Sequence, residues 1–527
     1  MKKIRRIYQT LFFILSIYVF YGGYSLIEWP VRLYHSLHIF PALSLLLTHS
    51  FNRYMALCLI LVVSAAFAGR FYCSFLCPMG FLQDLFDKAG KKLKISSNKT
   101  VNYPIIRYFI LFFTLFLTLS GSSAWGWIDH FSNFGRMIVS CVWPAVNILL
   151  SPFAGYLNRT SDFQIEGLLV TVGFDFYYSL LFMIFLIAVS LFRPRWFCNT
   201  LCPSGTIFSL VSSAGFLKIK LDDSCTKCEK CEKICPSGSI TVGNVDYSTC
   251  IGCFECVGAC TFHSLKLSFE KPFGAKGAAL KMPVSEFSDG GESRRTFIKR
   301  SAGVIAGIFA AGYSSRLIAA GINPKKINSV IPPGASNAQN FFSKCSACHM
   351  CISNCPTKVI VAAGFENGFA GLSKPKLDFS RSHCAYECNI CTGVCPSGAL
   401  KYLPLPLKQV TAIGLVTLDS SDKTECIPYK QKTDCGACAE HCPTGAVYMQ
   451  KHGDVFVPRI RKRYCIGCGI CENVCPVSSN KPIVVSPLAK HIKIFKLSDE
   501  EVKKNISPAP RVMKNGETKS GGNDFPF

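Results

Sequence analysis

The chemistry of this sequence begins with its cysteines, because 24 of the 30 cysteines in the 527-residue chain fall into six groups of four. The groups are Cys225, Cys228, Cys231 and Cys235; Cys250, Cys253, Cys256 and Cys260; Cys345, Cys348, Cys351 and Cys355; Cys384, Cys388, Cys391 and Cys395; Cys426, Cys435, Cys438 and Cys442; and Cys465, Cys468, Cys471 and Cys475. Four groups have the spacing C-x2-C-x2-C-x3-C, in which three thiolates hold one cluster and the fourth ligates a neighbour. The sequence therefore predicts six [4Fe-4S] clusters.

Clusters of this kind come in pairs, each within a small pseudo-symmetric ferredoxin unit. In the first pair we assign Cys225, Cys228, Cys231 and Cys260 to one cluster and Cys250, Cys253, Cys256 and Cys235 to the other. Among the last four groups the pairing is adjacent or nested, and the spacing fits both. Two groups depart from the pattern, with one extra residue before Cys388 and six before Cys435, and Thr261 replaces the usual proline.

Two other kinds of metal centre, structural zinc and c-type haem, also use cysteine ligands or attachment sites. Structural zinc is typically held by two separated pairs of ligands rather than by four cysteines within eleven residues. The segment CSACH, Cys345–His349, matches the attachment signature of c-type haem. Both of its cysteines already belong to a complete cluster group, so we expect iron–sulfur ligation there and a solvent-facing His349.

Four further cysteines occur in two C-x3-C-P motifs, Cys73 and Cys77 in GRFYCSFLCPMG, and Cys198 and Cys202 in RWFCNTLCPSG. Cysteines four residues apart lie on one face of a helix. We expect the four thiols to converge on a redox site, either a further cluster or a redox dithiol. The alternative is four inert buried cysteines, the role that we assign to Cys58 and Cys141.

The elements that position these motifs are predicted to be membrane helices. Apolar stretches at about Thr10–Trp29, Tyr54–Gly69, Pro104–Ser120 and Gly173–Phe192 predict four spans, the second lengthened by the preceding FPALSLLLT. The loop from Arg70 to Tyr103 carries six Lys and Arg residues and the loop from Gly121 to Thr171 carries two, so the first is expected in the cytoplasm. Both C-x3-C-P motifs then lie at the cytoplasmic face.

The segment SRRTFIKRSAGVIAGIFAAG, Ser293–Gly312, resembles a twin-arginine export signal placed inside the chain. It predicts a fifth, topology-switching segment that is kept as an anchor, followed by a cluster domain exported folded and loaded. The fold class is a multi-domain α-helical membrane protein with α+β ferredoxin-like domains on both sides of the membrane. The expected divisions are a membrane domain, 1–214; a cytoplasmic two-cluster ferredoxin domain, 215–270; a linker, 271–292; the twin-arginine segment, 293–321; a periplasmic four-cluster domain, 322–486; and a disordered tail, 487–527.

Composition agrees with a part-membrane protein, since 49% of the residues are hydrophobic and 17% are charged. A net charge of +25 raises the question of nucleic acid, but we attribute it to cytoplasmic loops and to a docking surface for an acidic redox partner. Cysteine spacing of this kind excludes a secreted disulfide scaffold.

The motifs together resemble a known family. Residues 1 to about 270 resemble the NapH-type membrane ferredoxin of periplasmic nitrate reductase systems. Residues from about 290 to 486 resemble its partner NapG and the methylamine-utilisation ferredoxin, on the twin arginines, Val330–Ala335 and four cluster groups. The chain resembles a fusion of the two partners, similar also to MauN and MauM. This implies a quinol dehydrogenase of the bacterial inner membrane that serves anaerobic respiration by passing electrons to a periplasmic reductase or cytochrome.

Quinol oxidation needs a proton acceptor at the membrane boundary, where ionisable residues are functional candidates. The candidates on the outward side are Glu28, His35, His38, His49, Asp129, His130 and Asp175. Ordinary interfacial solvation explains any single one of them better than a role in proton transfer does. Two other functions stay open, a maturation or redox-maintenance ferredoxin for a partner metalloenzyme and a cluster-based redox sensor.

Overall fold

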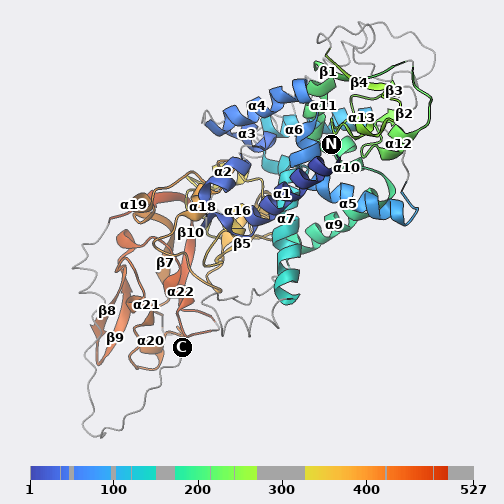
Figure 1. Ribbon diagram of the computed structural model, residues 1–527. Coiled ribbons are helices and arrows are strands. Elements are labelled where there is room, and N and C mark those ends of the chain that lie inside the picture. The colour runs from blue at the N-terminus through green and yellow to red at the C-terminus, as the bar shows by residue number, and fades with distance from the viewer. Residues whose placement is uncertain are drawn as a thin grey trace, which may run out of the picture. The chain divides into compact units, whose positions relative to one another are not determined.

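The computed structural model describes most of the chain, and Figure 1 shows its elements. The described residues are 2–25, 27–35, 37–46, 53–96, 103–119, 122–149, 173–213, 215–222, 224–241, 244–269, 327–421, 424–478 and 480–495. They form two compact units: unit 1 is Met1–Asp378, Glu387–Lys408 and Pro487–His491, and unit 2 is Phe379–Tyr386, Gln409–Ser486 and Ile492–Phe527. The twin-arginine segment, 293–321, and the linker before it lie outside the described residues.

A body of packed helices forms the first half of unit 1 (Figure 1). Its helices are α1 (Lys2–Phe20), α2 (Glu28–His35), α3 (Ile39–Leu46), α4 (Arg53–Ala68), α5 (Pro78–Lys92), α6 (Pro104–Leu119), α7 (His130–Met137), α9 (Phe174–Phe192), α10 (Trp196–Thr200) and α11 (Pro203–Ser213). Short π-helical turns, η2 (Tyr72–Leu76) and η4 (Ile138–Val142), lie between them, and 3-10 turns are found at Gly23–Ser25 (η1) and Ser123–Trp127 (η3). Helix α5 packs on α9, and α11 packs on α4 and α6.

The helices follow the predicted spans only in part. Among the described residues, α9 is the one helix long and apolar enough to cross a membrane by length and composition. The apolar parts of α4 and α6, Ala56–Phe67 and Pro104–Leu119, are shorter. The first expected span is wrong in its bounds, because α1 begins at Lys2 and ends at Phe20, where Gly22, with φ of +110°, turns the chain. The second is divided, since α3 and α4 are separate helices.

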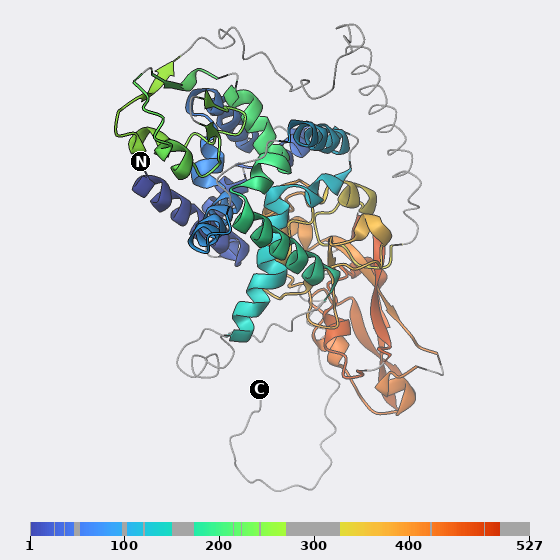
Figure 2. The same ribbon diagram turned by 90° about the vertical axis from the view of Figure 1, so that its right-hand side faces the viewer.

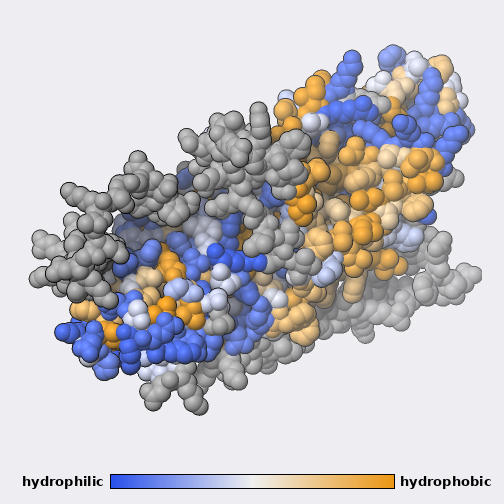
Figure 3. All heavy atoms as spheres, turned by 90° about the horizontal axis from the view of Figure 1, so that it is seen from below, coloured by the Kyte–Doolittle hydropathy of each residue, from blue (hydrophilic) through white to orange (hydrophobic). Residues whose placement is uncertain are grey.

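Large apolar side chains remain exposed on α1, α4, α6 and α9. They include Leu11 and Ile14 on α1, Leu59 and Ile60 on α4, Ile105 and Phe109 on α6, and Tyr177 and Leu181 on α9, each at least 57% exposed. Figure 3 shows apolar residues gathered over broad areas of one face. Exposed apolar surface of this extent marks contact with another apolar phase or partner.

The first ferredoxin unit is built from β1 (Leu217–Leu221), α12 (Lys230–Ile234), β2 (Ile240–Thr241), β3 (Asn244–Val245), α13 (Glu255–Ala259) and β4 (Leu265–Phe269). Strands β1 and β4 pair antiparallel, with Leu217 opposite Phe269, and thereby close the unit. The two short helices bring the fourth cysteine of each group beside the other group. In both Figure 1 and Figure 2 the start of α1 lies beside this unit.

Unit 1 also contains α15 (Ala338–Lys344), α16 (Met350–Ser353), β5 (Ile360–Ala362), α17 (Gly368–Gly371), β6 (Pro375–Leu377), α18 (Ile390–Gly393) and α19 (Leu405–Lys408). Strands β5 and β6 pair antiparallel, as β1 and β4 do. The region expected as one four-cluster domain, 322–486, is therefore divided between the two units.

Unit 2 contains β7 (Thr411–Leu418), α20 (Ile427–Lys430), α21 (Ala437–Glu440), β8 (Val447–His452), β9 (Val455–Ile460), the 3-10 turn η5 (Lys462–Tyr464) and α22 (Ile470–Asn473). Strand β10 (Ile483–Lys493) pairs with β7 and continues beyond residue 487, where a tail was expected. The amide of Ile494 donates to the carbonyl of Val410 at 2.9 Å, so backbone pairing continues to the end of the strand. The tail from 496 onward lies outside the described residues.

Candidate iron–sulfur centres and a buried proton-acceptor network

The two C-x3-C-P motifs belong to a longer internal repeat, RFYCSFLCPMG at Arg70–Gly80 and RWFCNTLCPSG at Arg195–Gly205. In each copy the first cysteine lies in a short helical turn, η2 or α10. The second cysteine caps η2 in the first copy and follows the Leu201 cap of α10 in the second. The following proline, Pro78 or Pro203, begins the next helix. Proline suits that position because its missing N–H has no helical partner there.

The structure brings the four thiols of this repeat together, as the sequence predicted. Cys73, Cys77, Cys198 and Cys202 are all at most 7% exposed. Burial, opposed in part by Arg195, raises the pKa of Cys198 to about 11, and the neighbouring Cys73 contributes to this rise. Burial likewise raises the pKa of Cys202, next to the other three thiols. Four buried thiols so close together fit a metal cluster, since coordination stabilises the thiolate form.

Two arginines and two glycines complete this site, and each arginine contacts the copy of the repeat to which it does not belong. Arg195 Nη1 donates to the carbonyl of Cys73 at 2.7 Å, and Arg70 Nη2 donates to the carbonyl of Cys198 at 3.4 Å. A Cβ on Gly80 or Gly205 would lie 2.7 Å from those same carbonyl oxygens. Sequence reasoning missed these four residues, although their identical spacing in both copies marked them.

Asp84 on α5 holds Arg195 and Arg5 in place. Arg195 donates to its carboxylate from Nε at 2.7 Å and from Nη2 at 2.8 Å. Arg5 also pairs with it, and Gln9 donates to it at 3.0 Å. Burial alone would raise the pKa of Asp84, but Arg195 and Arg5 outweigh it and hold the pKa at about 2. A buried carboxylate between two guanidinium groups stays ionised and fixes their direction.

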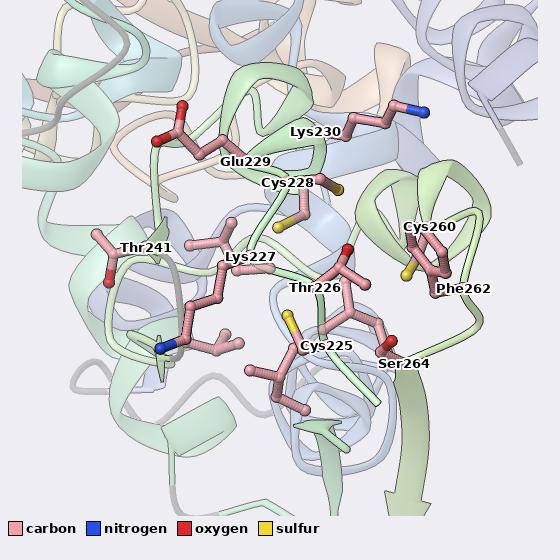
Figure 4. A pocket seen from close by; sticks show the side chains of 15 residues that line it. Cys225, Thr226, Lys227, Cys228, Glu229, Lys230, Thr241, Cys260, Phe262 and Ser264 are labelled. Carbon is pink, nitrogen blue, oxygen red and sulfur yellow. The ribbon is translucent and has the colours of Figure 1, made fainter. Parts of the chain in front are cut away.

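The first ferredoxin unit places its eight cysteines in the two predicted sets. One set lines an open hollow shown in Figure 4: Cys225, Cys228, Cys231 and Cys260. The second lines a separate hollow: Cys235, Cys250, Cys253 and Cys256. The fourth cysteine of each group thus crosses to the other group, which is the arrangement of a two-cluster ferredoxin.

Among the later cysteine groups, the third pairs with the fourth and the fifth with the sixth. The pairing is therefore adjacent rather than nested. In unit 1, Cys395 lies among the thiols of Cys345, Cys348 and Cys351. In unit 2 one hollow is lined by Cys426, Cys435, Cys438 and Cys475. The thiols of Cys465, Cys468 and Cys471 instead lie beside Cys442.

The remaining cysteines of these groups are Cys355, Cys388 and Cys391 in unit 1 and Cys384 in unit 2. The amide of Cys384 donates to the carbonyl of Cys468 at 2.9 Å. Across the described residues, no three His, Cys, Asp or Glu side chains are arranged to hold a single metal ion. Three of the cysteine sets are instead grouped around hollows, those of Cys225, Cys235 and Cys426.

His349 is buried, so the expectation that it faces solvent is wrong. It is 1% exposed, its Nε2 lies 2.9 Å from the carbonyl of Ser373, and its Nδ1 lies 3.4 Å from the hydroxyl of Ser140. Asp175, one of the proton candidates, lies 3.7 Å from the same Nε2 and accepts a hydrogen bond from Ser373. Asp175 is therefore engaged in packing α9 onto this cluster region.

Three of the predicted proton acceptors meet in one buried network next to the C-x3-C-P site. The hydroxyl of Tyr72 lies 3.2 Å from Nδ1 of His38 and 3.1 Å from Nε2 of His130. Nδ1 of His130 lies 3.2 Å from Oδ1 of Asp129. All four side chains are at most 2% exposed, and Tyr72 directly precedes Cys73. The sequence did not single out Tyr72, whose adjacency to a cluster cysteine was the available signal.

The other candidates lie elsewhere. Glu28 is exposed in the first turn of α2. His35 is the last residue of the same helix, and its side chain lies outside the described part of the structure, as does the whole of His49. Cys58 and Cys141 are buried within the helical body, apart from the cysteine sets.

Three models of iron–sulfur families match the chain. A 4Fe-4S binding domain matches residues 53–96 and 176–222, which contain both C-x3-C-P motifs. A 4Fe-4S dicluster domain matches residues 433–479, and a further 4Fe-4S binding domain matches 222–238 and 342–358.

Relatives match parts of the chain. An uncharacterized protein of Methanocaldococcus jannaschii is 28% identical over 273 residues, 50% of this chain and 95% of that protein. The ferredoxin-type protein NapF of Escherichia coli is 25% identical, covering 32% of this chain and 92% of its own. The methylamine utilization ferredoxin-type protein MauM of Methylobacillus flagellatus is 29% identical, covering 28% of this chain and 64% of its own. No solved structure matches the chain.

The matched domains coincide with the cysteine sets that the fold assembles, and the named relatives are ferredoxin-type proteins. The chain is an iron–sulfur, ferredoxin-type electron-transfer protein of the polyferredoxin kind.

Proposed function

We propose that this protein is a membrane-bound quinol dehydrogenase that joins a NapH-type half to a NapG-type half and delivers electrons to a periplasmic reductase or cytochrome. The observation that carries the proposal is the buried series directly beside Cys73, in which Tyr72 is hydrogen-bonded to His38 and to His130, and His130 lies against the carboxylate of Asp129. Oxidation of a quinol releases two protons and two electrons, so its site needs proton acceptors next to an electron acceptor. The network supplies the proton acceptors, and the C-x3-C-P thiols would hold the electron acceptor. The two meet at Tyr72 and Cys73, which are adjacent in the sequence.

Each member of the network has a definite task in this proposal. An imidazole nitrogen of His38 or His130 accepts a proton from a quinol hydroxyl. Asp129 stabilises the imidazolium that forms on His130, to which it is paired. The Tyr72 hydroxyl holds the imidazole rings of His38 and His130 in fixed positions and relays the proton between them. Burial of all four groups excludes bulk water from this relay.

The cysteines would hold the electron acceptors. Bound [4Fe-4S] clusters would supply one-electron acceptance and transfer. Cys73, Cys77, Cys198 and Cys202 would hold the one nearest to Tyr72, with Arg70 and Arg195 balancing the charge of the thiolates. The six cysteine groups would hold six more.

Exposed apolar side chains on α1, α4, α6 and α9 support a membrane location with four spans for the helical body. Basic residues between the second and third spans orient it with that loop in the cytoplasm. Among cellular membranes we assign it to the bacterial inner membrane, with the twin-arginine segment at 293–321 as a fifth, anchoring segment that needs the twin-arginine export machinery.

Contacts made by α1 support cluster domains on both sides of that membrane. Near its start Arg5 pairs with Glu255 of the first ferredoxin unit at 2.6 Å. Near its end the carbonyl of Val19 accepts a hydrogen bond from Asn354, in the third cysteine group, at 3.3 Å. Arg5 and Val19 are fourteen helical steps apart, about 21 Å at the helical rise of about 1.5 Å per residue.

The proposal is tested by mixing the purified, cluster-loaded protein with a soluble naphthoquinol or benzoquinol under anaerobic conditions. We expect rapid bleaching of the cluster absorbance with the wild type and slow bleaching with His130→Gln, at equal iron content. If no quinol reduces the wild type, the dehydrogenase assignment is wrong, and a maturation ferredoxin or redox sensor becomes the better account.

A further inference from the structure

The first ferredoxin unit has no task in the route from quinol to a periplasmic acceptor, yet it is joined closely to the C-x3-C-P site. Arg5 pairs through Nη1 with Glu255, which lies between Cys253 and Cys256, at 2.6 Å. The Nε of the same side chain lies 3.4 Å from the carbonyl of Ser74, which follows Cys73. A single buried guanidinium therefore touches one ligand loop of each centre.

Arg70 makes a second bridge between the same two centres. Its guanidinium donates to the carbonyl of Cys198 at 3.4 Å and to the carbonyls of Ser248 and Thr249, just before Cys250, at 3.3 and 3.5 Å. Arg107 also donates to Ser248, at 2.8 Å. Hydrogen bonds through such groups provide short, connected paths between ligand loops.

Two glycines allow the backbones of these regions to meet. A Cβ on Gly69 would lie 3.5 Å from the Cα of Gly252, which is between Cys250 and Cys253. Both glycines have positive φ, 69° and 64°, which disfavours any side chain at either position. The centre held by Cys235, Cys250, Cys253 and Cys256 therefore lies next to the C-x3-C-P centre.

The other centre of this unit opens to the surface. Cys228 is exposed, and Cys225, Cys231 and Cys260 are partly exposed, whereas Cys345, Cys348, Cys351 and Cys355 in the third group are all buried. A one-electron carrier in solution can approach a centre only where its ligands reach the surface. The three centres thus form a series from the aqueous phase to the helical body.

The edge of this hollow has the character of a docking site. Phe262 is 52% exposed and offers apolar contact area. Lys227 and Lys230 are exposed there, while the nearby Glu229 is paired with Lys233 at 3.6 Å. Figure 4 shows Lys227, Glu229 and Lys230 among the residues around the hollow. Lysines beside an apolar side chain favour an acidic partner protein.

We propose that this surface is a second electron port, at which a small acidic one-electron carrier protein docks on Lys227, Lys230 and Phe262. One electron leaves the reduced carrier and enters the centre that Cys225, Cys228, Cys231 and Cys260 would hold, and no covalent bond forms or breaks. Arg5 and Arg70 then connect the unit to the C-x3-C-P site, where this route meets the one proposed for quinol.

Stopped-flow mixing of the full-length, cluster-loaded protein with a reduced plant-type [2Fe-2S] ferredoxin as the probe tests the port. We expect fast, salt-sensitive oxidation of the ferredoxin, slowed about tenfold in Lys227→Glu/Lys230→Glu. Binding of the oxidised ferredoxin, measured by calorimetry, should weaken in the same variant. Lys451→Glu, a charge reversal at an exposed position of unit 2, is the matched control and should change neither measurement.

The quinol reaction distinguishes this proposal from the proposed function. Charge reversal at Lys227 and Lys230 should leave reduction by quinol unchanged, because neither lysine belongs to the proton-acceptor network around Tyr72. Fast reduction by quinol with no saturable oxidation of ferredoxin, or equal rates in the variant and the wild type, overturns the port alone. Fast ferredoxin oxidation without reduction by quinol overturns the dehydrogenase and retains the port.

Discussion

Arg195 donates from Nη1 to the carbonyl oxygen of Cys73 at 2.7 Å, across the two copies of the C-x3-C-P repeat. Arg70 makes the corresponding contact with Cys198 at 3.4 Å, so each copy orients the ligand loop of the other. Neither copy can form this site alone. The site is therefore a pseudo-symmetric centre whose geometry depends on both arginines as well as on the four thiols.

Arg195→Gln should destabilise this site strongly. The change removes both hydrogen bonds to Asp84 and leaves a buried carboxylate with less charge compensation, at a cost of about 3 to 5 kcal/mol. Chemical denaturation should show the lower free energy of unfolding, and iron counting should show loss of one cluster. Arg193→Gln, at a half-buried position two residues earlier, is the control and should retain the iron.

Gly80→Ala and Gly205→Ala should each remove the same cluster. The added Cβ would lie 2.7 Å from the carbonyl oxygen of Cys73 or Cys198, and overpacking of this kind costs about 1 to 3 kcal/mol. Gly258→Ala is the matched control, because a Cβ there meets no atom within 4 Å. Iron content that is equal in all three variants contradicts the role assigned to the two glycines.

The crossed pairing in unit 2 predicts which double variants lose one cluster and which lose two. Cys442→Ala with Cys465→Ala removes two ligands of the same set, so the iron content should fall by about four. Cys475→Ala with Cys465→Ala affects both sets and should remove about eight irons. Anaerobic iron analysis of the two proteins decides the pairing, and the reverse result would show that each group keeps its own fourth cysteine.

Arg136→Gln should lower the reduction potential of one cluster. Arg136 is buried, donates to the carbonyls of Ser346 and Ala347 at 3.0 and 2.9 Å, and lies over the ring of Trp127 at 4.2 Å. A buried cation beside the loop of Cys345 and Cys348 stabilises the reduced, more negative cluster. An EPR-monitored redox titration should show one midpoint moved downward with the others unchanged, and a set of unchanged midpoints would refute the effect.

The sequence predicted the chemistry better than the architecture. The spacing within the cysteine groups predicted which cysteines of the first ferredoxin unit share a ligand set. The two C-x3-C-P motifs predicted four converging thiols. Helix ends were less accurate, since α1 begins at Lys2 rather than near Thr10 and ends at Phe20 rather than near Trp29, because Gly22 turns the chain. His349 was predicted at the surface because its burial depends on Ser140 and Ser373, which are distant in sequence.

The proton-acceptor network shows the same limit. His38 and His130 were candidates only because they are ionisable residues near predicted membrane boundaries. Tyr72, which connects them, lies 34 and 58 residues away, and no local pattern reports such a contact. By contrast, Arg70 and Arg195 could have been found from the sequence, because both copies of the repeat place arginine three residues before the first cysteine.

The most direct test of the account is rapid freeze-quench EPR of wild type and Tyr72→Phe after anaerobic mixing with a soluble quinol. The Tyr72 hydroxyl joins His38 to His130 beside Cys73, so its removal should slow the appearance of reduced-cluster signals about 100-fold, the scale of general acid–base catalysis. The iron content and the signals after dithionite reduction should match those of the wild type. Equal rates in the two proteins, with full cluster content, would contradict quinol oxidation at this network.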